Sequence, residues 1–474
     1  YDTASLQNIF VDKESAYFCD INGVLCEKPY WSDSIYRIKR CPSLNSTTTF
    51  EIPSTVAYIE NRAFSGCKNL EHIVFMEDND NPSDITIGSD AFRDCINLQE
   101  MYLPQNLSEI SYDCFEGCSS INKFQISEKN EYFYTDENGV LYTKDVSELI
   151  QYPAGNSTLS AFTVPDTVTT IRSTAFSSAS YLESITIPDT FTEISQGMLW
   201  GCTGLKYFTI PASVTSIEFA AFYGCSSLQS ITIPKTVASI GDSAFSGCNS
   251  LKSFIIPETV TSIGDRVFSD CSSLESITIP KTVTSIGDSF FSGCSSLKSF
   301  IIPETVTSIG DRVFSDCSSL KTINLPSQLT SIGKWAFADC NALTTITIPD
   351  SVTSIGGYAF QCCKNLTATH LPTSLVTIPA QLFMDCTSLT SIEIPENVAA
   401  LDRHAFYNCT SLTSVYFYGD APTIASKSTF SQTPSSLVLY YIAGKSGWTS
   451  PTWTDSNGVT YNTATFTPGD VDPK

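Results

Sequence analysis

Residues 252–274 read KSFIIPETVTSIGDRVFSDCSSL, and residues 298–320 repeat this string without a change. The two segments that alternate with it, 229–251 and 275–297, differ from each other at only four positions. A double unit of 46 residues has therefore been copied beside itself. Repetition at a fixed period of about 20–50 residues is typical of solenoids, in which each coil packs only against its neighbours.

The same unit continues on both sides of these four coils. Aligned on its cysteine, it reads L-x-x-I-x-I-P-x-x-V-T-S-I-G-x-x-A-F-x-x-C-x-S. Its proline slot is filled in eleven consecutive coils, and its cysteine slot recurs every 23 residues. Side chains that return once per coil point into a shared interior, so we predict a core that contains Cys202, Cys225, Cys248, Cys271, Cys294, Cys317, Cys340, Cys363, Cys386, Cys409, Phe222, Phe245, Phe268, Phe291 and Phe314.

Twenty-three residues per coil leave room for short strands and turns but not for a full helix. Residues 231–233 alternate apolar and polar, which predicts a strand with its isoleucines on one face. Pro234 ends this strand because proline cannot donate to a sheet ladder. Residues 237–240 form a second extended piece, and residues 242–245 are predicted to be a short helical turn that carries Phe245 inward. Equivalent strands then pair in register as a parallel sheet.

Over about residues 44–418 this motif resembles the BspA-like, or treponemal-type, leucine-rich repeats. The resemblance implies a β-rich solenoid: a curved right-handed superhelix of about 17 coils, with parallel sheet on its concave face and short turns or 3-10 segments elsewhere. It also implies extracellular or cell-surface proteins of host-associated organisms, with roles in adhesion or protein binding and without catalytic residues.

The remaining segments interrupt or end the repeats. Asn-Gly between apolar runs is the strongest short hairpin signal, and it occurs at Asn22-Gly23 and Asn138-Gly139. We therefore predict projecting hairpins in both places. The predicted organisation is a degenerate repeat with a hairpin at 1–43, a solenoid at 44–418 with a hairpin insert at about 128–152, a capping region at 419–466 and a linker-like tail at 467–474.

The cysteine spacing argues for buried thiols. Ala179 occupies the slot one coil before Cys202, so the position accepts any small apolar side chain. Stacking would place successive cysteines about 4.8 Å apart with parallel side chains, which is poor disulfide geometry. Serial disulfides and a metal site stay as alternatives, although the spacing lacks the paired ligands of a zinc site. Cys19 and Cys26 could form a bridge across the first hairpin.

Charge and composition exclude several functions. The chain has 49 acidic and 26 basic residues, a net charge of −23, which disfavours nucleic acid and anionic membranes as partners. No apolar run approaches the roughly 18 residues of a membrane span. Because Tyr1 falls within a broken repeat, we expect any signal peptide and anchor to lie outside this sequence.

The sequence contains no recognisable catalytic set. Only three histidines occur, His72, His370 and His404, and the first two lie roughly a dozen coils apart. Nucleophile, metalloprotease and phosphate-loop motifs are absent. Asp265 and Asp288 begin a turn in each coil, where capping of backbone amides is the expected role. The acidic segment 77–82 is either a solvated loop or a divalent-ion site. We predict a protein without enzymatic activity, metal or cofactor.

The concave face is the candidate binding surface. The side chains that point outward from its strands are mostly Ser, Thr and Ile, and aromatic or charged residues break this pattern toward the ends. One interpretation is that Thr and Ile simply suit strands. The other is an extended binding surface, for which the predicted residues are Tyr102, Tyr207, Thr232, Ile255, Thr278, Ile301, Asn324, His370, Glu393 and Tyr416.

These observations predict an extracellular or cell-surface protein, monomeric, that binds a host or neighbouring-cell macromolecule, a protein or possibly a glycan. It would bind no nucleic acid and insert into no membrane. A structural stalk that presents a terminal domain is the alternative, because copied coils add reach without new contacts. A glycan-binding module is a third interpretation, since exposed aromatic rings can stack on sugars.

Overall fold

The computed structural model describes residues 6–30, 32, 34–76 and 84–469. The chain divides into two compact units, residues 1–231 and 232–474. Within the described ranges every regular element is a β-strand, and no helix is present. The acidic segment 77–82 and the last five residues of the chain lie outside the described residues.

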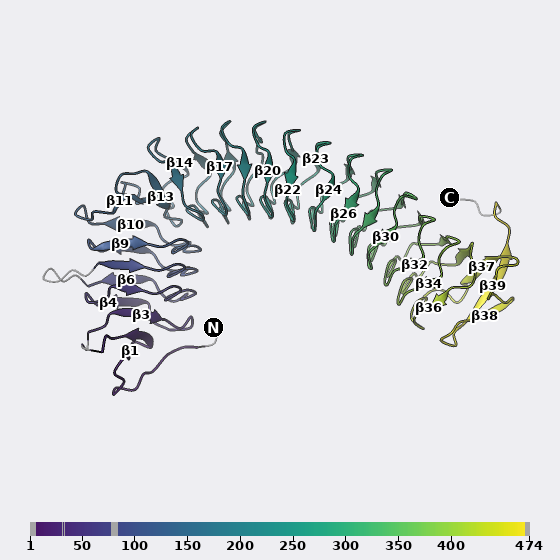
Figure 1. Cartoon of the computed structure of the whole chain (residues 1–474), viewed down its shortest axis with the longest axis horizontal. Helices are drawn as coiled ribbons and strands as arrows, with labels where there is room; N and C mark the ends of the chain where they lie inside the picture. The colour runs from purple at the N-terminus through teal and green to yellow at the C-terminus, as the bar shows by residue number, and fades with distance from the viewer. Residues whose placement is uncertain (1–5, 31, 33, 77–83, 470–474) are drawn as a thin grey trace. The chain divides into compact units, whose positions relative to one another are not determined.

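Most coils of the N-terminal unit contribute one short strand to each of two parallel ladders (Figure 1). The A ladder is formed by the I-x-I segments: β4 (Thr49–Ile52), β6 (His72–Phe75), β8 (Glu100–Leu103), β10 (Lys123–Ile126), β14 (Ala161–Thr163), β16 (Ser184–Thr186) and β18 (Tyr207–Phe208). The B ladder is formed by the segments that precede the glycine slot: β3 (Arg37–Arg40), β5 (Tyr58–Ile59), β7 (Ile85–Ile87), β9 (Leu107–Ile110), β13 (Glu148–Gln151), β15 (Thr170–Ile171), β17 (Glu193–Ile194) and β19 (Ser216–Ile217).

The C-terminal unit repeats this arrangement (Figure 1). Its A ladder contains β21 (Ser253–Ile255), β23 (Ser276–Thr278), β25 (Ser299–Ile301), β27 (Thr322–Asn324), β29 (Thr345–Thr347), β31 (Ala368–His370), β33 (Ser391–Ile394) and β35 (Ser414–Phe417). Its B ladder contains β20 (Ser239–Ile240), β22 (Ser262–Ile263), β24 (Ser285–Ile286), β26 (Ser308–Ile309), β28 (Ser331–Ile332), β30 (Ser354–Ile355), β32 (Thr377–Ile378), β34 (Ala400–Leu401) and β36 (Thr423–Ile424).

The register of the strands follows the repeat. In β21 and β23, Ser253 pairs with Ser276 and Ile255 with Thr278, residues that are 23 positions apart. Phe254, between the two outward residues of β21, is buried. The predicted β-solenoid with parallel, in-register sheets is therefore confirmed, and the described ranges contain about 18 turns rather than about 17. Its curvature and hand stay predictions.

The third side of each coil is also hydrogen-bonded to its neighbour. Ser289, Phe291 and Gly293 donate their amides to carbonyls of the next coil at 2.7–2.9 Å. Ser289 and Gly293 have φ values of 53° and 77°. The predicted short turns are present, since Ser292 donates to the Ser289 carbonyl at 3.1 Å and Cys294 to that of Phe291 at 3.0 Å, but they do not join into a helical segment. Left-handed residues four positions apart interrupt a helical path here, and the amides of alternate residues find partners in the next coil instead of within their own segment.

The cysteine slot lies inside this third side. Each core cysteine and phenylalanine named in the sequence analysis is fully buried. The Cys317 thiol donates to the carbonyl of Phe291 in the preceding coil at 3.2 Å, and Cys340 donates to Phe314 at 3.1 Å. None of the chain's eighteen cysteines, all within the described ranges, is in a disulfide. The slot thus selects a small side chain that can also donate a weak hydrogen bond.

Burial should make these thiols inert in the folded protein. Burial raises the pKa of Cys271 to about 12. At about pH 8, where an ordinary thiol with a pKa of about 8.5 is partly ionised, Cys271 therefore has very little of the reactive thiolate. Cys362 is only half-buried, and burial followed by the charge of Asp339 raises its pKa to about 11. We expect iodoacetamide mass spectrometry to find Cys362 labelled progressively as the pH is raised, while Cys271 stays unlabelled until denaturant is added. Labelling of Cys271 in the folded protein at about pH 8 would contradict this assignment.

The Gly-Asp pair of the motif links neighbouring coils on the B-ladder side. The carboxylate of Asp265 accepts the backbone amide of Asp288 at 2.9 Å, and that of Asp288 accepts the amide of Asp311 at 2.8 Å. The expected capping is thus present, but it bridges two coils instead of starting a helix. A Cβ atom at Gly310 would lie 2.6 Å from the carboxylate Oδ1 of Asp288, so a side chain does not fit here while that carboxylate holds its position.

This contact gives a stability prediction. Gly310→Ala should lower the free energy of unfolding by about 1–3 kcal/mol, because the new methyl group displaces the Asp288 carboxylate. Asp288→Ala alone should cost about 1 kcal/mol through the lost hydrogen bond. Urea unfolding of the double variant should show less destabilisation than the sum of the two, since the clash is then absent. Strict additivity would show that the two residues do not interact.

Both predicted hairpins form, but they do not project. β1 (Phe18–Ile21) and β2 (Val24–Glu27) pair antiparallel, and β2 continues onto β3 of the B ladder. β11 (Phe133–Thr135) and β12 (Leu141–Thr143) likewise continue onto β13. Val140 and Leu141 are fully buried. The hairpin therefore packs its apolar side chains against the core instead of extending into solvent. Cys19 and Cys26 lie opposite each other in the first hairpin.

The last coils end in strands that depart from the repeat. β37 (Val438–Ile442) and β39 (Thr460–Phe466) extend the A ladder in parallel, and β38 (Thr452–Thr454) pairs antiparallel with β39. The rings of Phe417 and Trp448 lie 4.9 Å apart, and those of Trp448 and Trp453 lie 4.8 Å apart. Trp448 and Trp453 are buried in this aromatic cluster, and the capping role of the region stays a prediction.

Candidate functional site

The predicted binding residues of the N-terminal unit stand alone on its surface. Tyr102 in β8 and Tyr207 in β18 are 52% and 56% exposed. The Tyr102 hydroxyl donates to the Glu100 carboxylate at 2.7 Å. Neither tyrosine lines a cavity together with another predicted residue, among the hollows found in the described ranges.

Five predicted residues of the C-terminal unit are exposed, four of them on A-ladder strands; the fifth, Thr232, lies where the predicted strand at 231–233 does not form. Thr232, Ile255, Thr278, Ile301 and Asn324 are all exposed. Ile255 and Thr278 are cross-strand neighbours, as are Ile301 and Asn324. The two isoleucines are 71% and 85% exposed. We call the side chains that point away from the core on these strands the outward face of the A ladder.

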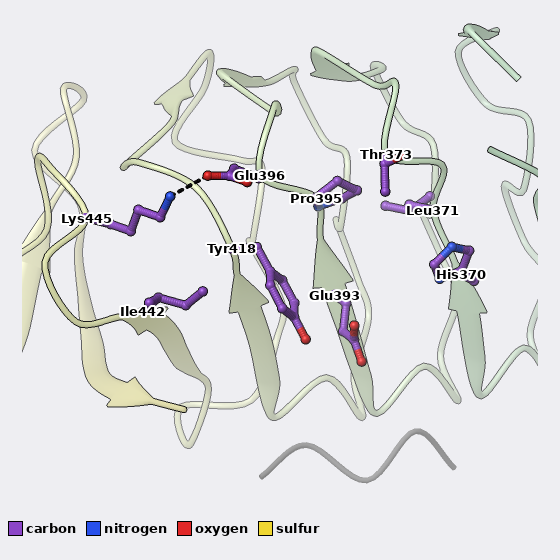
Figure 2. Close-up of a pocket in the computed structure, with 9 residues that line it drawn as sticks. All are labelled: His370, Leu371, Thr373, Glu393, Pro395, Glu396, Tyr418, Ile442 and Lys445. Atoms are coloured by element: carbon purple, nitrogen blue, oxygen red, sulfur yellow. Dashed lines mark hydrogen bonds and ion pairs between the residues drawn. The ribbon is translucent and has the colours of Figure 1, made fainter. Parts of the chain in front are cut away.

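The structure brings three predicted residues together at the last coils of this face. His370 and Glu393 line one pocket of about 310 Å³. Tyr416 lies beside Glu393 in the ladder, directly opposite it across β33 and β35. Figure 2 shows the Glu393 carboxylate and the ring of Tyr418 projecting to the same side, with His370 on the next strand. The remaining lining residues are Leu371, Thr373, Pro395, Glu396, Ile442 and Lys445.

Sequence reasoning missed Tyr418, although the repeat contains a signal for it. Tyr418 occupies the slot that is proline in the eleven preceding coils, one unit after Pro395. Unlike proline, it donates its amide to the Ile394 carbonyl at 3.1 Å, which ties this slot to the previous coil. Because tyrosine replaces the smaller proline ring at this position, an aromatic side chain lines the pocket.

The pocket has one ion pair and one additional carboxylate. Lys445 binds Glu396 at 2.6 Å, and this hydrogen bond raises the pKa of Lys445. Within the described part of the chain, Glu393 has no Lys, Arg or His within ion-pair distance. Burial, followed by the charge of Glu393, raises the pKa of Tyr418 to about 12. The phenol therefore stays protonated next to a negative carboxylate.

An aromatic row lies next to the pocket. The rings of Tyr416 and Tyr440 stack at 4.9 Å, and Phe466 meets both Tyr416 and Tyr418 edge-on at 5.4 Å. The hydrophobic signal for this row is visible in residues 437–442, but their pairing with β35 could not be inferred because the 23-residue period breaks there.

The described residues around the pocket include few reactive groups. No group of three or more His, Cys, Asp or Glu able to hold a metal ion occurs among the residues the structure describes. His370 is exposed and Glu393 is half-buried, and the pocket offers them no serine, cysteine or lysine nucleophile that is not already paired. In the described ranges, no helix has the length and hydrophobicity that crossing a membrane requires.

Comparison with known families identifies the repeat. The pattern described as BspA type Leucine rich repeat region (6 copies) matches residues 38–137, 148–271, 216–343 and 308–437. The chain belongs to the BspA-type leucine-rich repeat family. The predicted resemblance is thereby confirmed, and solenoids of this kind are typically non-catalytic binding scaffolds. No curated protein matches the chain significantly.

Solved leucine-rich repeat structures are similar to this one. A leucine-rich repeat protein from Bacteroides ovatus is 27% identical with a TM-score of 0.50, covering 65% of this chain and 92% of its own. A leucine rich cell surface protein from Faecalibacterium prausnitzii is 28% identical with a TM-score of 0.48, covering 68% and 95%. A leucine-rich repeat protein from Eubacterium ventriosum is 26% identical with a TM-score of 0.39, covering 67% and 77%.

The coupling between Glu393 and Tyr418 can be measured. Removing the negative charge with Glu393→Gln should lower the pKa of Tyr418 from about 12 toward the usual value of about 10. The measurement is a pH titration by NMR of protein labelled at the tyrosine ring carbon that carries the hydroxyl, with Tyr418→Phe to assign the signal. Glu51→Gln, at the same position of an early coil, is the control and should change nothing. If the pKa of Tyr418 is unchanged in Glu393→Gln, the two side chains do not interact electrostatically.

Proposed function

We propose that this protein is an extracellular or cell-surface binding protein without enzymatic activity, which attaches to a macromolecule of a host or a neighbouring cell. The outward face of the A ladder is the contact surface. The partner is a protein, the binding protein is a monomer, and neither nucleic acid nor membrane insertion is involved. The BspA-type family, whose repeats commonly serve surface and adhesion roles, supports this proposal.

The exposure of Ile301 carries the proposal. This side chain is 85% exposed on a strand face whose neighbours are Ser, Thr and Asn, and Ile255 repeats the arrangement two coils earlier. Stacking of the coils depends on the inward residues, so it does not require isoleucine at these positions. Large apolar side chains on an otherwise polar surface are typical of interaction sites. The near absence of charge along the same row favours contact with a protein surface.

The proposal is tested by capture on immobilised extracellular-matrix proteins, measured by biolayer interferometry. The double variant Ile255→Ser and Ile301→Ser should weaken capture by about tenfold or more, because two exposed anchors are lost. Val376→Ser is the matched control, since Val376 is 60% exposed but lies outside the A-ladder strands. Alanine variants at Tyr102, Tyr207, His370 and Tyr416 extend the scan along each unit.

Two outcomes would contradict the proposal. If the double isoleucine variant and Val376→Ser behave alike, the outward face of the A ladder is not the contact surface. If the wild-type protein captures none of the matrix proteins and no cells, a binding role fails altogether.

A structural stalk is the second candidate, favoured by the identity of residues 252–274 and 298–320. Deleting residues 252–297 joins Leu251 to Lys298 and restores the native junction sequence, so the shortened solenoid keeps its register. A stalk would keep its function at shorter reach, whereas a binding surface that spans these coils would lose affinity. A glycan-binding module is the third candidate, supported by the stacked rings of Tyr416 and Tyr440.

A further inference from the structure

We propose that the pocket formed by Glu393 and Tyr418 receives one basic side chain, arginine or lysine, of a partner protein. The inference rests on the proposed binding function and names the chemistry that this part of the surface recognises. It depends on a carboxylate without a cationic partner, an adjacent aromatic ring, apolar walls and a cavity of suitable size.

Glu393 supplies the charge. Its neighbour Glu396 is already neutralised by Lys445 at 2.6 Å, at the opposite side of the pocket (Figure 2). No comparable partner approaches Glu393 among the described residues. A half-buried carboxylate interacts with a cation more strongly than an exposed one, because less water screens the pair. A ligand with one positive charge would therefore be stabilised in the pocket by the Glu393 carboxylate.

Tyr418 supplies a surface that a cation can lie against. Its ring lines the pocket beside the Glu393 carboxylate (Figure 2). The face of an aromatic ring attracts ammonium and guanidinium groups when they lie within about 6 Å of its centre. The same chain already uses this interaction, since the Arg312 guanidinium lies 4.3 Å from the ring centre of Trp335.

The other walls fit the stem of a long basic side chain. Leu371, Pro395 and Ile442 present apolar atoms to the pocket. Arginine and lysine bury their methylene stems along such surfaces while the charged end reaches a polar partner. A volume of about 310 Å³ is at the small end of ligand pockets, which suits a single side chain rather than a large ligand.

The net charge of the chain favours the same partner. At −23, the protein attracts basic surfaces and repels acidic ones before contact is made. An acidic peptide would place its carboxylates against Glu393 and the already neutralised Glu396, where it would find no free cation. A neutral sugar could stack on Tyr418, but it would leave the Glu393 charge without a counter-ion.

A related hollow in the N-terminal unit provides an internal control. Glu51 occupies the same position of its coil as Glu393, and Met76 occupies the slot of Tyr418. Both residues line a hollow of about 610 Å³. It has the carboxylate but lacks the aromatic wall, and it is about twice as large as the pocket at Glu393. We expect it to bind a basic side chain much more weakly.

The test uses two capped tripeptides, acetyl-Gly-Arg-Gly-amide and its citrulline counterpart, which has nearly the same shape but no charge. Isothermal titration of the full chain should show binding of the arginine peptide that is about tenfold tighter than that of the citrulline peptide. Glu393→Gln should remove this difference, and Glu51→Gln should preserve it. Tyr418→Leu keeps the pocket apolar and should weaken binding about threefold or more through the lost cation–π contact.

Equal binding of the arginine and citrulline peptides would overturn the inference, as would equal losses in Glu393→Gln and Glu51→Gln. Tighter binding of an N-acetylglucosamine oligosaccharide than of the arginine peptide would assign the pocket to a glycan instead. Circular dichroism melting of each variant excludes unfolding as the cause. The proposed function is judged separately by matrix capture: if capture persists in Glu393→Gln while peptide binding behaves as expected, only the role of this pocket in adhesion fails.

Discussion

Each coil of this protein places its backbone hydrogen bonds in the neighbouring coils, because 23 residues are too few to form a sheet by themselves. Within the A ladder and within the B ladder, strand amides and carbonyls pair from coil to coil. On the third side, amides such as those of Ser289 and Gly293 donate to carbonyls of the next coil. A buried backbone group left without a partner costs about as much as a lost hydrogen bond. The strands of neighbouring coils must therefore stay in register, although the loops between them can differ in length: His72 pairs with Glu100, 28 positions away.

This constraint explains residue types that have no catalytic purpose. Cysteine is favoured where a small buried side chain can also donate to a carbonyl of the preceding coil, as Cys317 does to Phe291. Glycine fits where the Asp288 carboxylate passes close to Gly310 on its way to the Asp311 amide. Phenylalanine rings stack from coil to coil, with Phe337 and Phe360 at 5.4 Å and 7°. The inward and turn positions are thus determined by neighbouring coils.

The outward positions are free of that constraint, and the functional proposals rest on them. A strand tolerates Ser, Thr, Ile or Glu on its outward side, so Ile301 and Glu393 can differ without disturbing the stack. The last coils use this freedom most. Tyr418 replaces the recurring proline, and β37 and β39 add Tyr440, Ile442 and Phe466 to the same face. A uniform array thereby acquires one site of distinct shape and charge.

The sequence by itself determined the repeat period, the strand register, the buried Cys and Phe positions and the outward direction of Ile255, His370 and Glu393, because these follow from side chains that recur every 23 residues. Only the tertiary structure decided the rest. It showed left-handed residues four positions apart on the turn side, such as Ser289 and Gly293, and hairpins that continue into the B ladder. It also joined His370 and Glu393 with Tyr418, Ile442 and Lys445 in one pocket. Ile442 and Lys445 lie beyond the point where the period breaks, so their positions depend on how β37 packs against β35, which no periodic pattern encodes.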